Sequence, residues 1–113
     1  MHAMTTAARA YQNAASHRGV RAQEADVFRR ANVNLHAAKT AGPVAKAKAL
    51  ADNHRLWISV VDLLRDPANT LPKELRASIV SVGLAVQREA HRAEPDFGFL
   101  ISVNESIAAG LEG

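Results

Sequence analysis

Residues 53–77 read NHRLWISVVDLLRDPANTLPKELRA, and this stretch decides the fold. Its first part repeats apolar side chains at helical spacing around Trp57, the only tryptophan of the chain. Residues 66–70 combine Asp, Pro, Ala, Asn and Thr, which is typical of a turn. Beyond Pro72 apolar side chains again recur at helical spacing. The stretch therefore predicts two helices that are joined by a short hairpin turn.

Both helices of this hairpin have wide apolar faces. Along the first helix two stripes run side by side, one with Leu50, Trp57, Val61 and Leu64 and the other with Leu56, Val60 and Leu63. The second helix carries on one face Leu75, Ile79, Val82 and Val86. A wide apolar face is expected of a helix that contacts neighbours on more than one side.

Three further helical segments flank the hairpin. The five expected helices cover residues 5 or 6 to 16, 20–40, 44–65, about 70–92 and about 97–111. No segment shows sustained alternation of apolar and polar residues, so no sheet is predicted. We expect an all-α fold, a compact bundle of about five helices in a single domain of residues 1–113, with residues 1–4 disordered.

Glycine, proline and capping residues mark the ends of these helices. The expected stops are Gly19 for the first helix and Gly42-Pro43 for the second. The expected N-caps are Thr5 or Thr6 for the first helix and Asn69 or Thr70 for the fourth.

The composition limits the class of protein. Of the 113 residues 48% are apolar but only 4% are aromatic, which suits closely packed helices better than a sheet. The sequence has no cysteine, so disulfides and thiolate metal ligands are excluded, and a cytoplasmic location is expected. No apolar run approaches the ~18 residues of a membrane-spanning helix, and the first residues lack the pattern of a signal peptide.

Basic residues outnumber acidic ones in the first half of the chain, and the formal net charge is +3. The acidic residues before residue 50 are Glu24 and Asp26. The basic residues in the same part are Arg9, Arg18, Arg21, Arg29, Arg30, Lys39, Lys46 and Lys48. This half is either a solvated helix surface or a surface that attracts RNA or an acidic protein. Tyr11 and Phe28 are isolated aromatics, so no base-stacking platform is indicated.

The five histidines of the chain are candidate metal ligands. They are His2, His17, His36, His54 and His91. None lies three or four residues from another, and no set has the spacing of a zinc site. The spacing therefore predicts no metal and no cofactor.

Asp62 and Asp66 lie four residues apart, on one side of the predicted helix end. Paired carboxylates can carry out acid–base chemistry. The favoured interpretation is a structural clamp, in which Arg76 of the next helix pairs with either aspartate. The chain has no nucleophile motif and no glycine-rich phosphate loop, so we predict no enzymatic activity.

Three residues interrupt the helical patterns. Gly83 lies in mid-helix, which indicates close approach of another helix or a groove left open for a partner helix. Asn104 interrupts an apolar stripe, and it either fixes the register inside the bundle or contacts the backbone of a bound peptide. Trp57 is expected in the core, although an exposed tryptophan would be the natural anchor of an interface.

A series of short motifs follows in a fixed order along the chain. They are Ala10-Tyr11; Arg21, Glu24 and Phe28 to Leu35; Asn53-His54-Arg55-Leu56-Trp57 with Asp62-Leu63; Asn69-Thr70-Leu71-Pro72 with Leu75-Arg76-Ala77; Arg88-Glu89; and Leu100-Ile101-Ser102-Val103-Asn104 with Gly110-Leu111. In order and separation they resemble the flagellar biosynthesis regulator FlaF family of alphaproteobacteria, over nearly the whole chain. The family often has a second tryptophan in the fourth helix, where this chain has Leu84-Ala85-Val86.

The resemblance implies a small cytoplasmic regulator of flagellum biogenesis and motility, needed for flagellin production and filament assembly. Family members are thought to act as flagellin chaperones in protein secretion. They work beside a second regulator, FlbT, which controls flagellin messenger RNA. The family brings no catalytic residues and no cofactor.

With flagellin as the implied partner, the apolar faces of the hairpin become the predicted binding surface. Its residues are Leu56, Trp57 and Val60 opposite Leu75, Ile79, Val82 and Gly83. A helix laid into such a surface would be covered along one side. One alternative is an RNA-associated regulator of flagellin expression that acts with FlbT. Another is a homodimer that uses the same faces.

Overall fold

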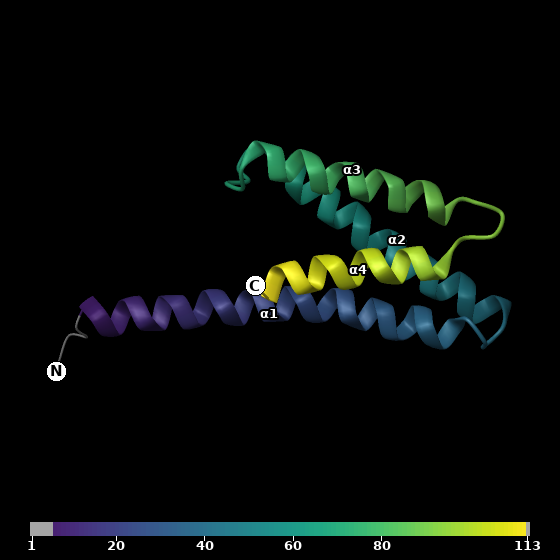
Figure 1. The fold of residues 1–113 in the computed structure, drawn as a ribbon, viewed down its shortest axis with the longest axis horizontal. Coiled ribbons are helices and arrows are strands. Elements are labelled where there is room, and N and C mark those ends of the chain that lie inside the picture. Colours follow the sequence, from purple (N-terminus) through teal and green to yellow (C-terminus); the bar gives the residue numbers. More distant parts are fainter. Residues whose placement is uncertain (1–5, 113) are drawn as a thin grey trace.

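The computed structural model describes residues 6–112, with side chains from residue 22 onward. Within this range it has no strand and four helices, which are α1 (Thr6–Ala38), α2 (Pro43–Arg65), α3 (Lys73–Ala90) and α4 (Phe97–Glu112) (Figure 1). The prediction of a single all-helical domain is confirmed, but the number of helices was overestimated by one. The expected N-cap of the first helix and the expected disorder of residues 1–4 lie outside the described residues and side chains.

The two helices predicted for residues 6–40 are one continuous helix, α1. The prediction of a stop at Gly19 was wrong. Glycine inside a helix costs only about 0.5–1 kcal/mol relative to alanine and leaves the backbone hydrogen bonds in place. No proline or turn cluster follows Gly19, so nothing else ends the helix there.

The stop at the end of α1 is confirmed. Gly42 has a φ angle of 98°, a left-handed conformation that glycine adopts without strain. Pro43 then occupies the first position of α2, where its missing N–H has no partner to lose. These two residues turn the chain from α1 into α2.

Asn69 organises the turn between α2 and α3 but does not cap α3 as predicted. Its side-chain amide Nδ2 donates to the carbonyl oxygen of Leu63 at 3.0 Å, and its Oδ1 accepts from the backbone N–H of Leu71 at 2.9 Å. Pro72 stands directly before the first residue of α3, and no side chain caps that helix. The short polar side chain thus joins the two ends of the hairpin instead of one helix terminus.

The loop before α4 is held by two carboxylates. Oδ1 of Asp96 accepts the backbone N–H of Phe99 at 3.0 Å, which caps α4. Oε2 of Glu89 accepts the backbone N–H of Asp96 at 3.1 Å. The start of α4 is therefore fixed to the end of α3.

The helices are arranged as two pairs. α4 lies along the C-terminal half of α1, and α2 with α3 forms the hairpin (Figure 1). The two pairs are joined mainly by contacts between α1 and α2, whereas α3 and α4 make little contact and diverge from their connecting loop (Figure 1). The N-terminal half of α1 extends beyond the end of α4 (Figure 1).

The core lies where α1, α2 and α4 meet. Its largest buried side chain is Trp57, which is 0% exposed and packs edge-to-face on Phe28 with ring centroids 5.8 Å apart. The other buried apolar residues are Ala25, Leu35, Ala38, Ala49, Val61, Leu64, Val86, Leu100 and Ala108. The prediction that Trp57 is a core residue is confirmed.

A hydrogen-bonded network of three asparagines crosses this core. Oδ1 of Asn104 accepts the indole N–H of Trp57 at 2.8 Å. Its Nδ2 donates to Oδ1 of Asn32 at 3.0 Å and to Oδ1 of Asn53 at 2.7 Å. Asn32 in turn donates to the carbonyl oxygen of Ile101 at 3.0 Å. Asn104 therefore links α1, α2 and α4 from inside the bundle, as the first of its two interpretations predicted.

Gly83 lies at a point where α3 packs tightly against α2. A Cβ atom at this position would lie 2.6 Å from Cγ2 of Val61 and 3.1 Å from Cε3 of Trp57. Both neighbours are core side chains with little room to move. The close-approach interpretation of Gly83 is confirmed.

Replacing Gly83 by alanine should therefore lower the free energy of unfolding by about 1–3 kcal/mol, the usual cost of overpacking. Gly110 of α4 is the matched control, because a Cβ there meets nothing within 4 Å. Gly110→Ala should leave stability unchanged or raise it by up to about 1 kcal/mol. Urea denaturation followed by circular dichroism measures both. Equal effects of the two substitutions would contradict the close-approach argument.

Candidate functional site

The structure separates the predicted binding residues into three groups. Trp57 and Gly83 are buried, so in this conformation they offer no surface to a partner. Leu75 is 45% exposed. The third group is half-buried against the core and consists of Leu56, Val60, Ile79 and Val82. The predicted surface is therefore mostly the inner contact of the hairpin, and only its edge is open.

Three leucines around the turn of the hairpin, which we call the leucine cluster, have exposed side chains. Leu63, Leu71 and Leu75 are 65%, 42% and 45% exposed. The side chain of Asn69 hydrogen-bonds to the backbones of Leu63 and Leu71, and Leu75 lies in the first turn of α3, four residues after Leu71. Helical spacing predicts Leu63 in one of the two apolar stripes of the first hairpin helix, and it predicts no role for Leu71.

Further apolar side chains are partly open to solvent on α3 and α4. On α3 the side of Leu75 carries Ile79 and Val82, both half-buried. On α4, Glu105 faces α1, since its carboxylate lies 3.6 Å from the guanidinium of Arg29. Successive residues of a helix are about 100° apart, so Val103, two residues before Glu105, lies nearly opposite to it. Val103 is therefore on the side of α4 that is turned away from α1.

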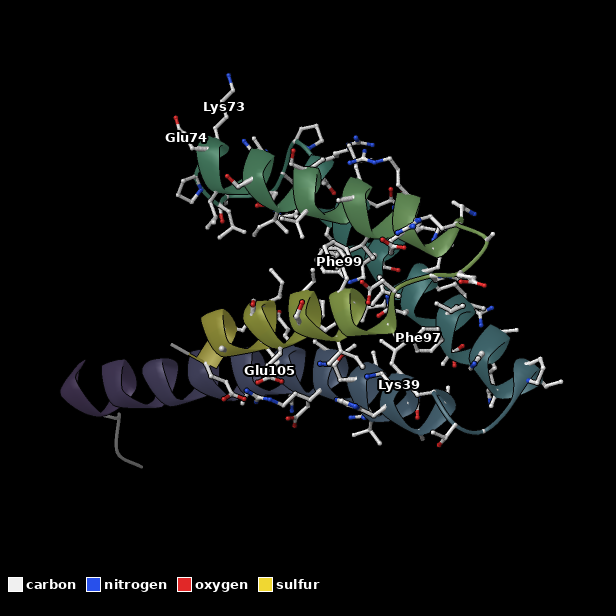
Figure 2. All side chains as sticks on the ribbon, turned by 45° about the vertical axis from the view of Figure 1, so that its right-hand side comes forward. Lys39, Lys73, Glu74, Phe97, Phe99 and Glu105 are labelled. Carbon is white, nitrogen blue, oxygen red and sulfur yellow. The ribbon has the colours of Figure 1, made fainter. Side chains whose placement is uncertain are left out.

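Phe99 extends the same side of α4 and is 37% exposed. Figure 2 shows its ring between α4 and α3. We call these residues together the open apolar face. It consists of the exposed Leu63, Leu71, Leu75 and Phe99 and of Ile79, Val82 and Val103, which are half-buried against the core. It stays open because α3 and α4 contact each other so little.

The predicted ion-pair clamp of the hairpin is not formed. Within the described residues, no carboxylate oxygen of Asp62 or Asp66 lies within 4.0 Å of the Arg76 guanidinium. Oδ1 of Asp66 accepts the backbone N–H of Ala68 at 2.9 Å instead. A short aspartate beside a turn satisfies its own backbone more readily than it reaches an arginine on another helix.

Part of the basic first half of the chain is neutralised by α4. Arg29 of α1 forms ion pairs with Glu105 and Glu112. The exposed remainder includes Arg30 and Lys39. Sequence reasoning could not see this pairing, because the partners are far apart in the chain.

Two surface depressions lie away from the open apolar face. The larger, of about 860 Å³, is at the end where the α1–α2 and α3–α4 loops meet. Its charged lining consists of Lys39, Lys46, Glu94 and Asp96. Because charges of both signs line it, it has no clear preference for an anion or a cation. The smaller one, of about 230 Å³, lies between α1 and α2 and is lined mainly by alanines.

Among the side chains that the structure describes, from residue 22 to residue 112, no cluster of three or more His, Cys, Asp or Glu could hold a metal ion. Over residues 6–112 no helix combines the length and the apolar character that a membrane span requires.

Residues 7–111 match the model of a protein family described as flagellar protein FlaF. No curated protein and no solved structure matches the chain significantly.

Proposed function

Because the chain belongs to the FlaF family of flagellar proteins, we propose that it binds flagellin in the cytoplasm as a secretion chaperone and so couples flagellin synthesis to export. The observation that carries this proposal is the open apolar face. Monomeric proteins seldom expose a row of large apolar side chains, and such rows mark sites of interaction with other proteins.

The open apolar face suits an amphipathic helix. Leu75, Ile79 and Val82 recur at intervals of four and three residues, which matches the spacing of a helical partner's own apolar stripe. Flagellin termini form amphipathic helices when they are paired. A terminal segment that has no partner before export would bury its apolar stripe against this face.

The energetic centre of the proposed interface is the leucine cluster at the turn. Its members are the most exposed residues of the face, so a partner would remove the largest apolar area from water there. Trp57 contributes to binding only by supporting the fold, since it is fully buried. Substitutions for testing the interface therefore belong at the leucines and not at the tryptophan.

Isothermal titration of the full chain with purified monomeric flagellin tests the proposal. We expect binding in the micromolar range and at least about tenfold weaker binding by Leu75→Asp, because a carboxylate would have to be desolvated in an apolar contact. Position 75 lies in the first turn of α3, where a negative charge is favourable to the helix, so the variant should fold.

Val33→Asp is the matched control for this titration. Val33 is 65% exposed on α1 and lies outside the open apolar face. The Val33→Asp variant should bind flagellin with the affinity of the unchanged protein. If the unchanged protein fails to bind at tens of micromolar, the proposed function is wrong. If both variants lose affinity equally, flagellin binds elsewhere.

A further inference from the structure

The N-terminal part of α1 projects from the rest of the described structure. Residues 22–24 are exposed, and Ala25 is the first buried residue among the described side chains. The last turn of α4 lies close to this point, since Glu112 pairs with Arg29. Beyond it α1 continues with no other described helix alongside (Figures 1 and 2). We call residues 6–23 the α1 overhang.

A helix without neighbours is marginally stable, because most helical stability in proteins comes from the packing of an apolar side. In the sequence of the overhang, Ala7, Ala10, Tyr11 and Ala14 recur at intervals of three and four residues. This spacing places them on one side of the helix. The overhang therefore has an apolar side that another helix or surface can bury.

The α3 side of the open apolar face forms one straight row. Glu89 accepts the backbone N–H of Asp96, directly before α4, so the side of α3 that carries Glu89 is turned toward α4. Val82 and Leu75 lie seven and fourteen residues before Glu89, which is about two and four helical turns, and so they share this side. Figure 2 shows the ring of Phe99 between α4 and α3, beside this row.

The length of α3 matches the length of the overhang. α3 has 18 residues, as many as residues 6–23. At 1.5 Å per residue each spans about 27 Å. Because α1 is one continuous helix, the overhang does not fold back onto its own chain. The open apolar face that it covers therefore belongs to a second copy.

The charges of the two parts are complementary. The overhang carries Arg9, Arg18 and Arg21, and no acidic residue precedes Glu24. Residues 66–112, which include all of the open apolar face except Leu63, have seven acidic and four basic residues. Opposite net charges favour the encounter of the two surfaces and disfavour the pairing of two overhangs with each other.

We propose that two copies of this chain form a dimer in which the α1 overhang of each copy lies on the open apolar face of the other. The exchange is reciprocal, so the dimer closes and covers both overhangs. Flagellin would then have to displace the overhang, because both use the same face. The dimer itself does not depend on the binding of flagellin.

Sedimentation equilibrium of the full chain tests the proposal. We expect a species of twice the mass of one chain, with a dissociation constant in the micromolar range. Leu75→Asp and Tyr11→Asp should each weaken the dimer at least about tenfold, because each puts a carboxylate into an apolar contact. Val33→Asp, on α1 but outside the overhang, should leave it unchanged. Circular dichroism verifies that each variant is helical.

Cross-linking identifies which parts of the two copies meet. The chain has no cysteine, so single cysteines can be introduced as Ala14→Cys in the overhang and as Ser78→Cys, an exposed position of α3. A short bismaleimide should join these two variants in a mixture, and it should not join Ser78→Cys to Val33→Cys.

A chain that stays monomeric at high micromolar concentration overturns the proposal. So does a dimer that Tyr11→Asp leaves intact, or a mixture in which Ala14→Cys and Ser78→Cys are not joined. None of these measurements contains flagellin, so the proposed function is decided separately by its own titration.

Discussion

Replacing Trp57 by alanine should lower the free energy of unfolding by at least about 4 kcal/mol. The indole is fully buried and packs on Phe28, so truncation would leave a large cavity between α1, α2 and α3. Its N–H also donates to Asn104, and the loss of this donor leaves one buried amide oxygen without its bond. Since small domains are stable by only about 5–15 kcal/mol, this single change would remove much of the stability.

Urea denaturation followed by circular dichroism at 222 nm measures this loss without relying on tryptophan fluorescence. The matched control is Ile58→Ala on the same helix, because Ile58 is 39% exposed. It should cost less than about 1.5 kcal/mol, since little apolar area returns to water. If Trp57→Ala were no more costly than this control, Trp57 would not be the core residue that the structure describes.

The second large effect is expected at Asn104. Replacing Asn104 by leucine keeps a side chain of similar size but removes three hydrogen bonds at once, those to Trp57, Asn32 and Asn53. Each buried group left without a partner costs about 1–3 kcal/mol, so we expect a loss of about 3–5 kcal/mol in the free energy of unfolding. The apolar side chain offsets part of that cost through its own burial.

Asn34→Leu is the control for this substitution, since Asn34 is an exposed asparagine in mid-helix on α1. Its effect should stay within about 0.5 kcal/mol. Tryptophan fluorescence gives an independent readout, because the emission of Trp57 should change when its hydrogen bond to Asn104 is lost. An Asn104→Leu protein as stable as the unchanged one would show that the network is dispensable for stability.

Helical spacing and turn chemistry predicted most of the local structure. The hairpin from α2 to α3, the stop at Gly42-Pro43 and the break before α4 follow from residues that are neighbours in the chain. The failure at Gly19 has a physical cause, because a glycine alone only lowers helix propensity. No proline or turn cluster stands beside it, so nothing local ends the helix and α1 continues through Gly19.

The central network was only half accessible to sequence reasoning. Asn104 stands out in the sequence because it interrupts an apolar stripe, and two other asparagines interrupt apolar stripes in the same way. Asn32 lies between Phe28 and Leu35 on α1, and Asn53 lies one turn before Trp57 on α2. A search for asparagine in apolar stripes would have found all three. That they meet at one point depends on the crossing of three helices.

The candidate site shows the same division. The wide apolar faces of α2 and α3 were predicted, but not which side of each would be covered. Trp57 and Gly83 are buried because the two helices pack closely, whereas Leu63 and Leu71 are exposed near the turn. Periodicity ranks residues by their tendency to be buried, and it does not say how many neighbours a helix will find.

The sequence by itself determined that this protein is helical, that residues 53–77 form a hairpin around a buried Trp57, and that it resembles FlaF. These properties follow from spacing, capping and composition, which act over a few residues. The tertiary structure alone decided the asparagine network and the open apolar face. Each of these joins residues from different helices, and their distances are set by how the helices pack.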